Sequence, residues 1–218
     1  MAHEYVLPLG DRRATLETVG GKGISLARLL RAHMPVPGGF HVSTAAYERF
    51  VAENDLKDKI RAALKGVDAS KPETLTNASE KIGALFSSAE VSGEISTAIF
   101  EAYAGLEGDD PAVAVRSSAT TEDLPGASFA GQQESFLNVR GEDRLLEAVR
   151  RCWTSLWSAR AIAYRERQGF DHDRAAIAVV VQRLVAAQVS GILFTANPLS
   201  GARDELVINA ALGLGEAV

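Results

Sequence analysis

The longest apolar run in this chain covers residues 175–181 (Ala-Ala-Ile-Ala-Val-Val-Val), and its length restricts the fold. A run this short, rich in β-branched residues, is typical of a buried strand and far too short to cross a bilayer. Residues 112–115 (Ala-Val-Ala-Val) have the same character. Residues 55–105 instead carry apolar side chains at the spacing of three amphipathic helices. The sequence therefore predicts a compact α+β fold.

The other elements follow from local signals. A glycine turn at residues 20–23 is expected to lead into a helix, which Pro35 and Pro37 stop. Ser43 and Thr44 are candidate N-caps for a helix over residues 45–53, and residues 143–168 form one long helical segment. Further strands are expected at residues 39–42, 135–139, 176–184, 191–195 and 205–211.

Composition excludes several classes of protein. The chain has 218 residues, of which 46% are hydrophobic and 23% charged, as in ordinary soluble globular proteins. Its net charge of −5 argues against a nucleic-acid partner. One cysteine, Cys152, allows neither an intramolecular disulfide nor a Cys-rich zinc site, which favours the cytoplasm. We expect no membrane partner, and the scattered histidines lack the spacing of a metal site.

Two distant segments each combine a cation with glycines or hydroxyls. Lys22 lies between glycines at the expected helix start, where its ammonium and the first-turn N–H groups can meet a phosphate. The alternative is a tight turn with a solvated lysine. The segment is not a Walker loop, because no Ser or Thr follows the lysine and Leu16 stands where that motif has its first glycine.

Arg116 follows the apolar run 112–115 and precedes two serines, so a stiff strand end would present its guanidinium to a phosphate. The alternative is an ion pair with Glu122 or Asp123. Gly131 and Ser135 are candidates for a loop that covers a triphosphate, although both are also ordinary turn residues. Together these segments make ATP the leading ligand.

Gln182 ends the run of valines, and its amide is a candidate for reading an adenine edge. The alternative is an edge-strand glutamine that faces water.

Several motifs, in order along almost the whole chain, resemble one family. They are residues 20–27 (Gly-Gly-Lys-Gly-Ile-Ser-Leu-Ala), 36–40 (Val-Pro-Gly-Gly-Phe), 114–120 (Ala-Val-Arg-Ser-Ser-Ala-Thr), 123–133 (Asp-Leu-Pro-Gly-Ala-Ser-Phe-Ala-Gly-Gln-Gln) and 190–198 (Ser-Gly-Ile-Leu-Phe-Thr-Ala-Asn-Pro). They resemble the N-terminal ATP-binding domain shared by phosphoenolpyruvate synthase, pyruvate phosphate dikinase and rifampin phosphotransferase. Gly23 after the lysine fits the rifampin and pyruvate phosphate dikinase branches better than the synthases.

The resemblance implies an ATP-grasp fold. Residues 1–184 would form the N-terminal lobe, with its glycine-rich loop and helical insertion, and residues 185–218 would begin a second lobe that is incomplete. By the resemblance, Lys22 and Arg116 bind phosphate, Gly131 and Ser135 belong to the covering loop, and Gln182 with Leu184 lies near adenine.

The resemblance also implies a reaction with ATP and Mg²⁺ as cofactors. ATP is split to AMP, and a phosphoryl group passes through a histidine on a separate domain to pyruvate or another acceptor such as rifampin. The phosphohistidine and acceptor domains are missing here, and the magnesium ligands are expected beyond Val218, so we expect this chain to be inactive alone. The alternative is a non-catalytic ATP-grasp-like regulatory or interaction protein.

Overall fold

The computed structural model describes residues 4–120 and 135–214. The chain divides into two compact units, with the boundary between Arg183 and Leu184. Within the described residues, no helix combines the length and the apolar character that crossing a membrane requires.

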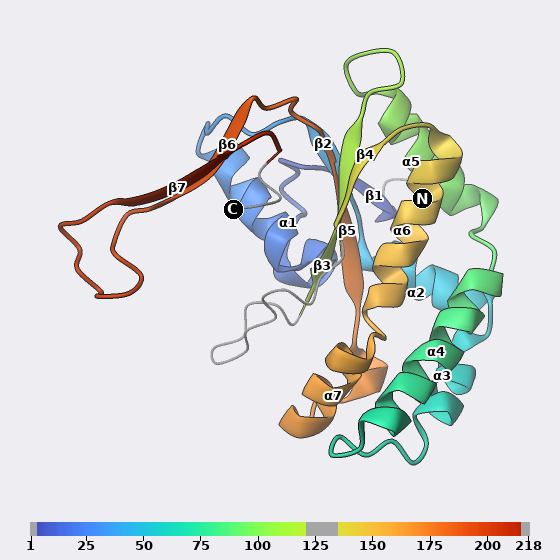
Figure 1. The fold of residues 1–218 in the computed structure, drawn as a ribbon. Coiled ribbons are helices and arrows are strands. Elements are labelled where there is room, and N and C mark those ends of the chain that lie inside the picture. Colours follow the sequence, from blue (N-terminus) through green and yellow to red (C-terminus); the bar gives the residue numbers. More distant parts are fainter. Residues whose placement is uncertain (1–3, 121–134, 215–218) are drawn as a thin grey trace. The chain divides into compact units, whose positions relative to one another are not determined.

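The centre of the first unit is an antiparallel sheet of five strands in the order β1-β2-β5-β3-β4 (Figure 1). Its strands are β1 (Val6–Pro8), β2 (Gly39–Val42), β3 (Val113–Ala119), β4 (Ser135–Val139) and β5 (Ile177–Arg183). The long apolar run is the central strand β5, and six of its seven residues are buried. The strands expected at 39–42, 135–139 and 176–184 are therefore confirmed.

Helices cover the sheet on both sides. The helix α1 (Leu16–Arg31) lies on one side, and α2 (Thr44–Glu53) and α6 (Glu142–Ser155) lie on the other (Figure 1). The three helices expected between residues 55 and 105 are α3 (Leu56–Leu64), α4 (Pro72–Ser88) and α5 (Gly93–Ala104), which confirms that prediction.

Alternation along the strands assigns each side chain to a face of the sheet. We call the face toward α1 the α1 face; it carries Leu7, His41, Ala114, Arg116, Ser118, Ala178, Val180 and Gln182. The opposite face, the core face, carries Phe40, Val42, Val113, Val115, Ile177, Val179 and Val181, all of which belong to the main hydrophobic core. The core face therefore packs against the main hydrophobic core, whereas the α1 face carries the polar side chains of His41, Arg116, Ser118 and Gln182.

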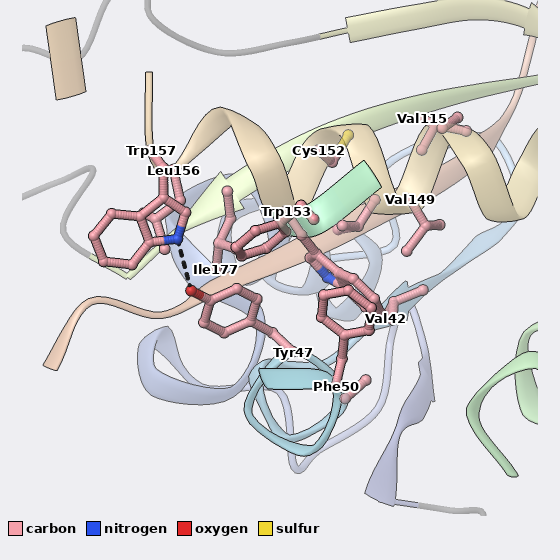
Figure 2. Packing of buried hydrophobic residues seen from close by; sticks show 14 of the residues in the cluster. Val42, Tyr47, Phe50, Val115, Val149, Cys152, Trp153, Leu156, Trp157 and Ile177 are labelled. Atoms are coloured by element: carbon pink, nitrogen blue, oxygen red, sulfur yellow. Dashed lines mark hydrogen bonds between the residues drawn. The ribbon is translucent and has the colours of Figure 1, made fainter. Parts of the chain in front are cut away.

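The main core packs α2, α4 and α6 against the core face. Trp153 is fully buried, and its ring lies 4.9 Å from that of Phe50 (Figure 2). The indole N–H of Trp157 donates to the hydroxyl of Tyr47 at 3.0 Å, which joins α2 to the segment between α6 and α7 (Ala159–Gln168). Cys152 is buried in the same cluster.

The prediction of one long helix over residues 143–168 is wrong. The chain forms α6, breaks, and restarts as α7 (Ala159–Gln168). The hydroxyl of Ser158 accepts a hydrogen bond from the N–H of Ala161, which is the N-cap geometry that starts a new helix. The apolar spacing continues across Ser158, so it does not reveal the boundary between α6 and α7 at this residue.

The start of α1 also differs from the sequence-based expectation. The helix begins at Leu16, and a capping box of Thr15 and Thr18 closes its first turn. The helix reaches the glycine-rich residues in its second turn and is kinked at the first of them, Gly20, whose φ of 68° lies outside the helical region. The four glycine-rich residues therefore form a kink inside a helix, not a turn before one.

The second unit contains a two-stranded antiparallel sheet of β6 (Val189–Phe194) and β7 (Val207–Leu212). Both strands were expected, with slightly different ends. Leu193 lies opposite Ile208, and Val189 lies opposite Leu212. The connection between the strands is closed by the N–H of Asn197, which donates to the carbonyl of Ala202 at 2.8 Å.

Candidate functional site

Lys22 follows the kink in α1 and reaches toward the sheet. Its side chain is half-buried, and its ammonium donates to the main-chain carbonyl of Ser117 at 3.1 Å. Ser117 is the neighbour of Arg116 in β3. The lysine is therefore fixed against the strand that carries the second cation, although the two residues are remote in sequence.

Arg116 lies in the middle of β3 and not at the end of a strand, as the sequence suggested. The strand continues because both following serines are buried and pair with β5. Arg116 itself is exposed on the α1 face, opposite Val180 in β5 and opposite Ser135 in β4. A central strand with neighbours on both sides is a stiff support for a guanidinium.

Ser118 links α1 to β3 directly. Its hydroxyl donates to the carbonyl of Val19 at 2.7 Å and accepts from the N–H of Gly23 at 3.1 Å. Gly20 lies against the same residue, since a Cβ on it would stand 2.2 Å from the carbonyl oxygen of Ser118. Sequence reasoning did not single out Ser118, because nothing local shows that it meets a helix almost a hundred residues away.

Gln182 lies in the central strand and is 9% exposed, so its interpretation as an edge-strand glutamine facing water is wrong. Its amide donates to the carbonyl of Pro37 at 3.2 Å. It shares the α1 face with Arg116, two pairing positions further along the sheet. The loop before β2 approaches closely here, since a Cβ on Gly39 would stand 2.2 Å from the carbonyl oxygen of Val181.

His41 is a further buried polar group on the α1 face. It is fully buried, and its Nε2 donates to the carbonyl of Leu9 at 3.2 Å. Among the described residues its Nδ1 has no hydrogen-bond partner. Burial lowers the pKa of His41, and the hydrogen bond to Leu9 and the negative charge of Asp11 oppose this shift less strongly. The neutral ring is thus the favoured form.

Four of the six candidate residues share one face: Lys22, Arg116, Ser135 and Gln182. Gly131 lies outside the described residues, as do Glu122 and Asp123, the proposed alternative partners of Arg116. Leu184 is half-buried and belongs to the second unit.

Carboxylates that could hold a metal ion are not gathered in this part of the chain. Over residues 4–120 and 135–214, no group of three or more His, Cys, Asp or Glu side chains has the arrangement of a metal site. Lys22 and Arg116 place two cationic side chains on the α1 face. This chemistry suits an anion and does not by itself suit Mg²⁺.

An α+β unit with two cations on one face of its sheet has the features of an anion-binding domain. The family of pyruvate phosphate dikinase AMP/ATP-binding domains matches the chain over residues 16–218. The chain belongs to this family. The match begins at the first residue of α1 and includes both cations.

Curated relatives agree with the family assignment. The chain is 50% identical over 207 residues to a probable phosphoenolpyruvate synthase of Methanocaldococcus jannaschii, covering 93% of this chain and 17% of that protein. It is 45% identical over 208 residues to the phosphoenolpyruvate synthase of Aeropyrum pernix, covering 93% and 25%. It is 41% identical over 236 residues to that of Pyrococcus furiosus, covering 92% and 29%.

The chain therefore spans less than a third of the length of these relatives. Their names give no support to the preference for the rifampin branch that Gly23 suggested.

Proposed function

We propose that this chain binds ATP on the α1 face of its five-stranded sheet, as the nucleotide-binding part of a dikinase-type phosphotransferase. The observation that carries the proposal is the contact between the ammonium of Lys22 and the carbonyl of Ser117, beside Arg116. Two cations from segments remote in sequence lie on the same face, in a family whose domain is described as AMP/ATP-binding. Charge-assisted hydrogen bonds from a lysine and an arginine bind phosphate oxygens strongly.

In the proposed complex, Arg116 and Lys22 neutralise the phosphates in different ways. The guanidinium of Arg116 is a planar fork that can contact two phosphate oxygens, and its strand holds it in place. The ammonium of Lys22 is a compact charge on a flexible stem, directed by its bond to Ser117. Ser135, opposite Arg116, would add a hydroxyl donor, and Gly131 would belong to the same covering segment.

Gln182 and Leu184 would lie on the adenine side. The amide of Gln182 already donates to Pro37, so one of its N–H groups is fixed and its carbonyl oxygen faces a defined direction. The carbonyl oxygen can accept a hydrogen bond from the exocyclic amine of adenine. Leu184 would supply an apolar contact to the ring at the point where the second unit begins.

Magnesium does not fit the described residues of this chain as a resident metal, because they do not gather the carboxylates that it prefers. We therefore derive no step through it. What these residues can do is bind and orient the nucleotide: they neutralise its charge and fix its phosphates relative to its base. Phosphoryl transfer depends on such positioning.

The wider reaction is part of the proposal. ATP would be split to AMP, and a phosphoryl group would pass through a histidine on a separate domain to an acceptor. The names of the relatives favour formation of phosphoenolpyruvate over phosphorylation of rifampin. An ATP-grasp arrangement, with residues 1–184 as one lobe and residues 185–218 as part of another, is proposed on the family resemblance. The chain alone would bind ATP without turning it over.

Calorimetric titration of the chain with ATP tests the proposal. We expect Lys22→Ala and Arg116→Ala each to raise the dissociation constant about tenfold to hundredfold, the range for hydrogen bonds to charged groups. Lys81→Ala and Lys65→Ala are charge-matched controls, because both residues are exposed, on α4 and at the end of α3, away from the α1 face. We expect them to change the dissociation constant less than about twofold.

A wild-type chain that shows no saturable ATP binding would contradict the proposal. So would control variants that weaken binding as much as the site variants, since net charge alone would then explain the effect.

A further inference from the structure

The side chain of Ser118 is inserted into the hydrogen-bond ladder of α1. In a regular helix the N–H of Gly23 would donate to the carbonyl of Val19, four residues earlier. Here the hydroxyl of Ser118 stands between them: it donates to Val19 at 2.7 Å and accepts from Gly23 at 3.1 Å. A side chain inserted into the ladder is one of the recognised causes of a helix kink. The hydroxyl of Ser118 in β3 therefore bridges two main-chain groups of α1 that would bond directly in a regular helix.

The surrounding contacts favour the opened helix. The carbonyl of Glu17, which a regular helix would pair with Gly21, accepts a hydrogen bond from the hydroxyl of Thr44 at 2.8 Å. Gly20 adopts φ 68°, and its missing Cβ leaves the space into which the main chain of Ser118 fits. Two hydroxyls and one glycine thus hold the kink open.

The kink sets the position of Lys22 relative to Arg116. Gly23, the residue held by Ser118, is the immediate neighbour of Lys22, and Ser118 is two residues beyond Arg116 on the same face of β3. Ser118 and Gly20 are both fully or almost fully enclosed, so the link is rigid. We infer that Ser118 is a positioning residue: its inserted hydroxyl holds the kink of α1 and thereby fixes the spacing of the two cations. This inference rests on the proposed function for its consequence on ATP binding.

Removing the hydroxyl would leave Val19 and Gly23 without their bridge. Either the two groups re-form a direct helical bond, which turns Lys22 away from its present position, or they stay unpaired in a buried place. In both cases the phosphates lose part of their contact, whereas the base and ribose of the ligand do not. The expected effect is selective for phosphate.

The test compares Ser118→Ala with Ser43→Ala. Ser43 is also buried, and its hydroxyl also donates to a main-chain carbonyl, that of Glu4 at 2.6 Å, so the control removes a similar bond elsewhere. Three quantities are measured: the dissociation constant of ATP, that of adenosine, and the rate of amide hydrogen exchange at Gly23. For Ser118→Ala we expect ATP binding weaker by about threefold to tenfold, adenosine binding changed less than about twofold, and Gly23 exchange faster by about threefold to tenfold.

For Ser43→Ala we expect none of these changes. Unchanged ATP binding in Ser118→Ala would overturn the inference, as would equal losses for ATP and adenosine, because the hydroxyl would then merely stabilise the fold. If the wild type binds no ATP, the proposed function fails, and Gly23 exchange decides about the kink: faster exchange supports the inserted hydroxyl, and unchanged exchange overturns it.

Discussion

At the residue scale, burial on the α1 face changes the pKa of a titratable side chain, His41. The ring is fully buried between α1 and the sheet, one nitrogen is bonded to Leu9, and the other has no partner among the described residues. A proton on that second nitrogen would place a positive charge in a buried site. Burial therefore lowers the pKa of His41 below its ordinary value of 6.5.

The free energy of unfolding should consequently depend on pH below about 6.5. There the unfolded chain protonates His41 while the folded chain does not, so the unfolded state binds more protons and stability falls as the pH falls. Urea unfolding at pH 7.5 and at pH 5.5 measures this difference. We expect His41→Asn to lose less stability over this range than the wild type.

His33→Asn is the matched control, because His33 is exposed. This variant should lose as much stability as the wild type over the same range. A wild type and a His41→Asn variant with the same pH dependence would contradict the account of the buried ring.

Single residues were predictable from the sequence to the extent that their chemistry is local. Lys22 among glycines and Arg116 beside a buried run marked an anion site from residue type alone. The same reasoning could not find Ser118 or assign Gln182 to a central strand. Those properties depend on register and on contacts between segments far apart in the chain, which no local pattern contains.

At the element scale, the sequence predicted the helices and strands whose apolar residues recur at a regular spacing. It missed helix boundaries that this spacing does not mark. The strand β5 and the helices α3 to α5 were found because their apolar spacing is regular. The true start of α1 was hidden because glycines usually end helices, whereas here Ser118 and Thr44 support the helix on both sides of Gly20. The break between α6 and α7 was hidden by continuous apolar spacing.

The kink in α1 leads to a prediction about Gly20. Gly20→Ala should destabilise the chain by about 2–5 kcal/mol, because φ 68° with ψ −179° is a conformation almost restricted to glycine and the Cβ of alanine would stand 2.2 Å from the carbonyl oxygen of Ser118. Urea unfolding monitored by circular dichroism measures the loss.

Gly66→Ala separates the two causes. Gly66 also has a positive φ, of 82°, but apart from its chain neighbours no atom of the described residues lies within 4 Å of the place its Cβ would take. It should cost only about 1–2 kcal/mol, the strain contribution alone. Equal losses in the two variants would mean that the close approach of Ser118 to α1 contributes nothing.

At the scale of the whole molecule, the two units differ in how they bury apolar surface. The first unit covers both faces of its sheet with helices. In the second unit, one face of the hairpin carries only apolar residues: Val189, Gly191, Leu193, Ile208, Ala210 and Leu212. Leu193 is 54% exposed, Ile208 66% and Leu212 88%. A two-stranded hairpin cannot enclose its own apolar face, and it is marginally stable alone.

We therefore expect the isolated chain to self-associate through this hairpin face. Leu193 and Ile208 lie directly opposite each other, so Leu193→Lys with Ile208→Glu places a compatible ion pair on that face. The double variant should weaken association at least about a hundredfold, since burying each aliphatic side chain contributes about 1.5–3 kcal/mol. Sedimentation velocity over a wide range of protein concentrations measures it.

The matched control places the same charges on the other face of the hairpin. Ser190 and Ala211 also lie opposite each other, so Ser190→Lys with Ala211→Glu keeps net charge and strand register equal to those of the first double variant. This control should associate like the parent chain, because the apolar face is intact. If both double variants abolish association equally, charge and not the apolar face is responsible, and a parent chain that stays monomeric throughout removes the premise.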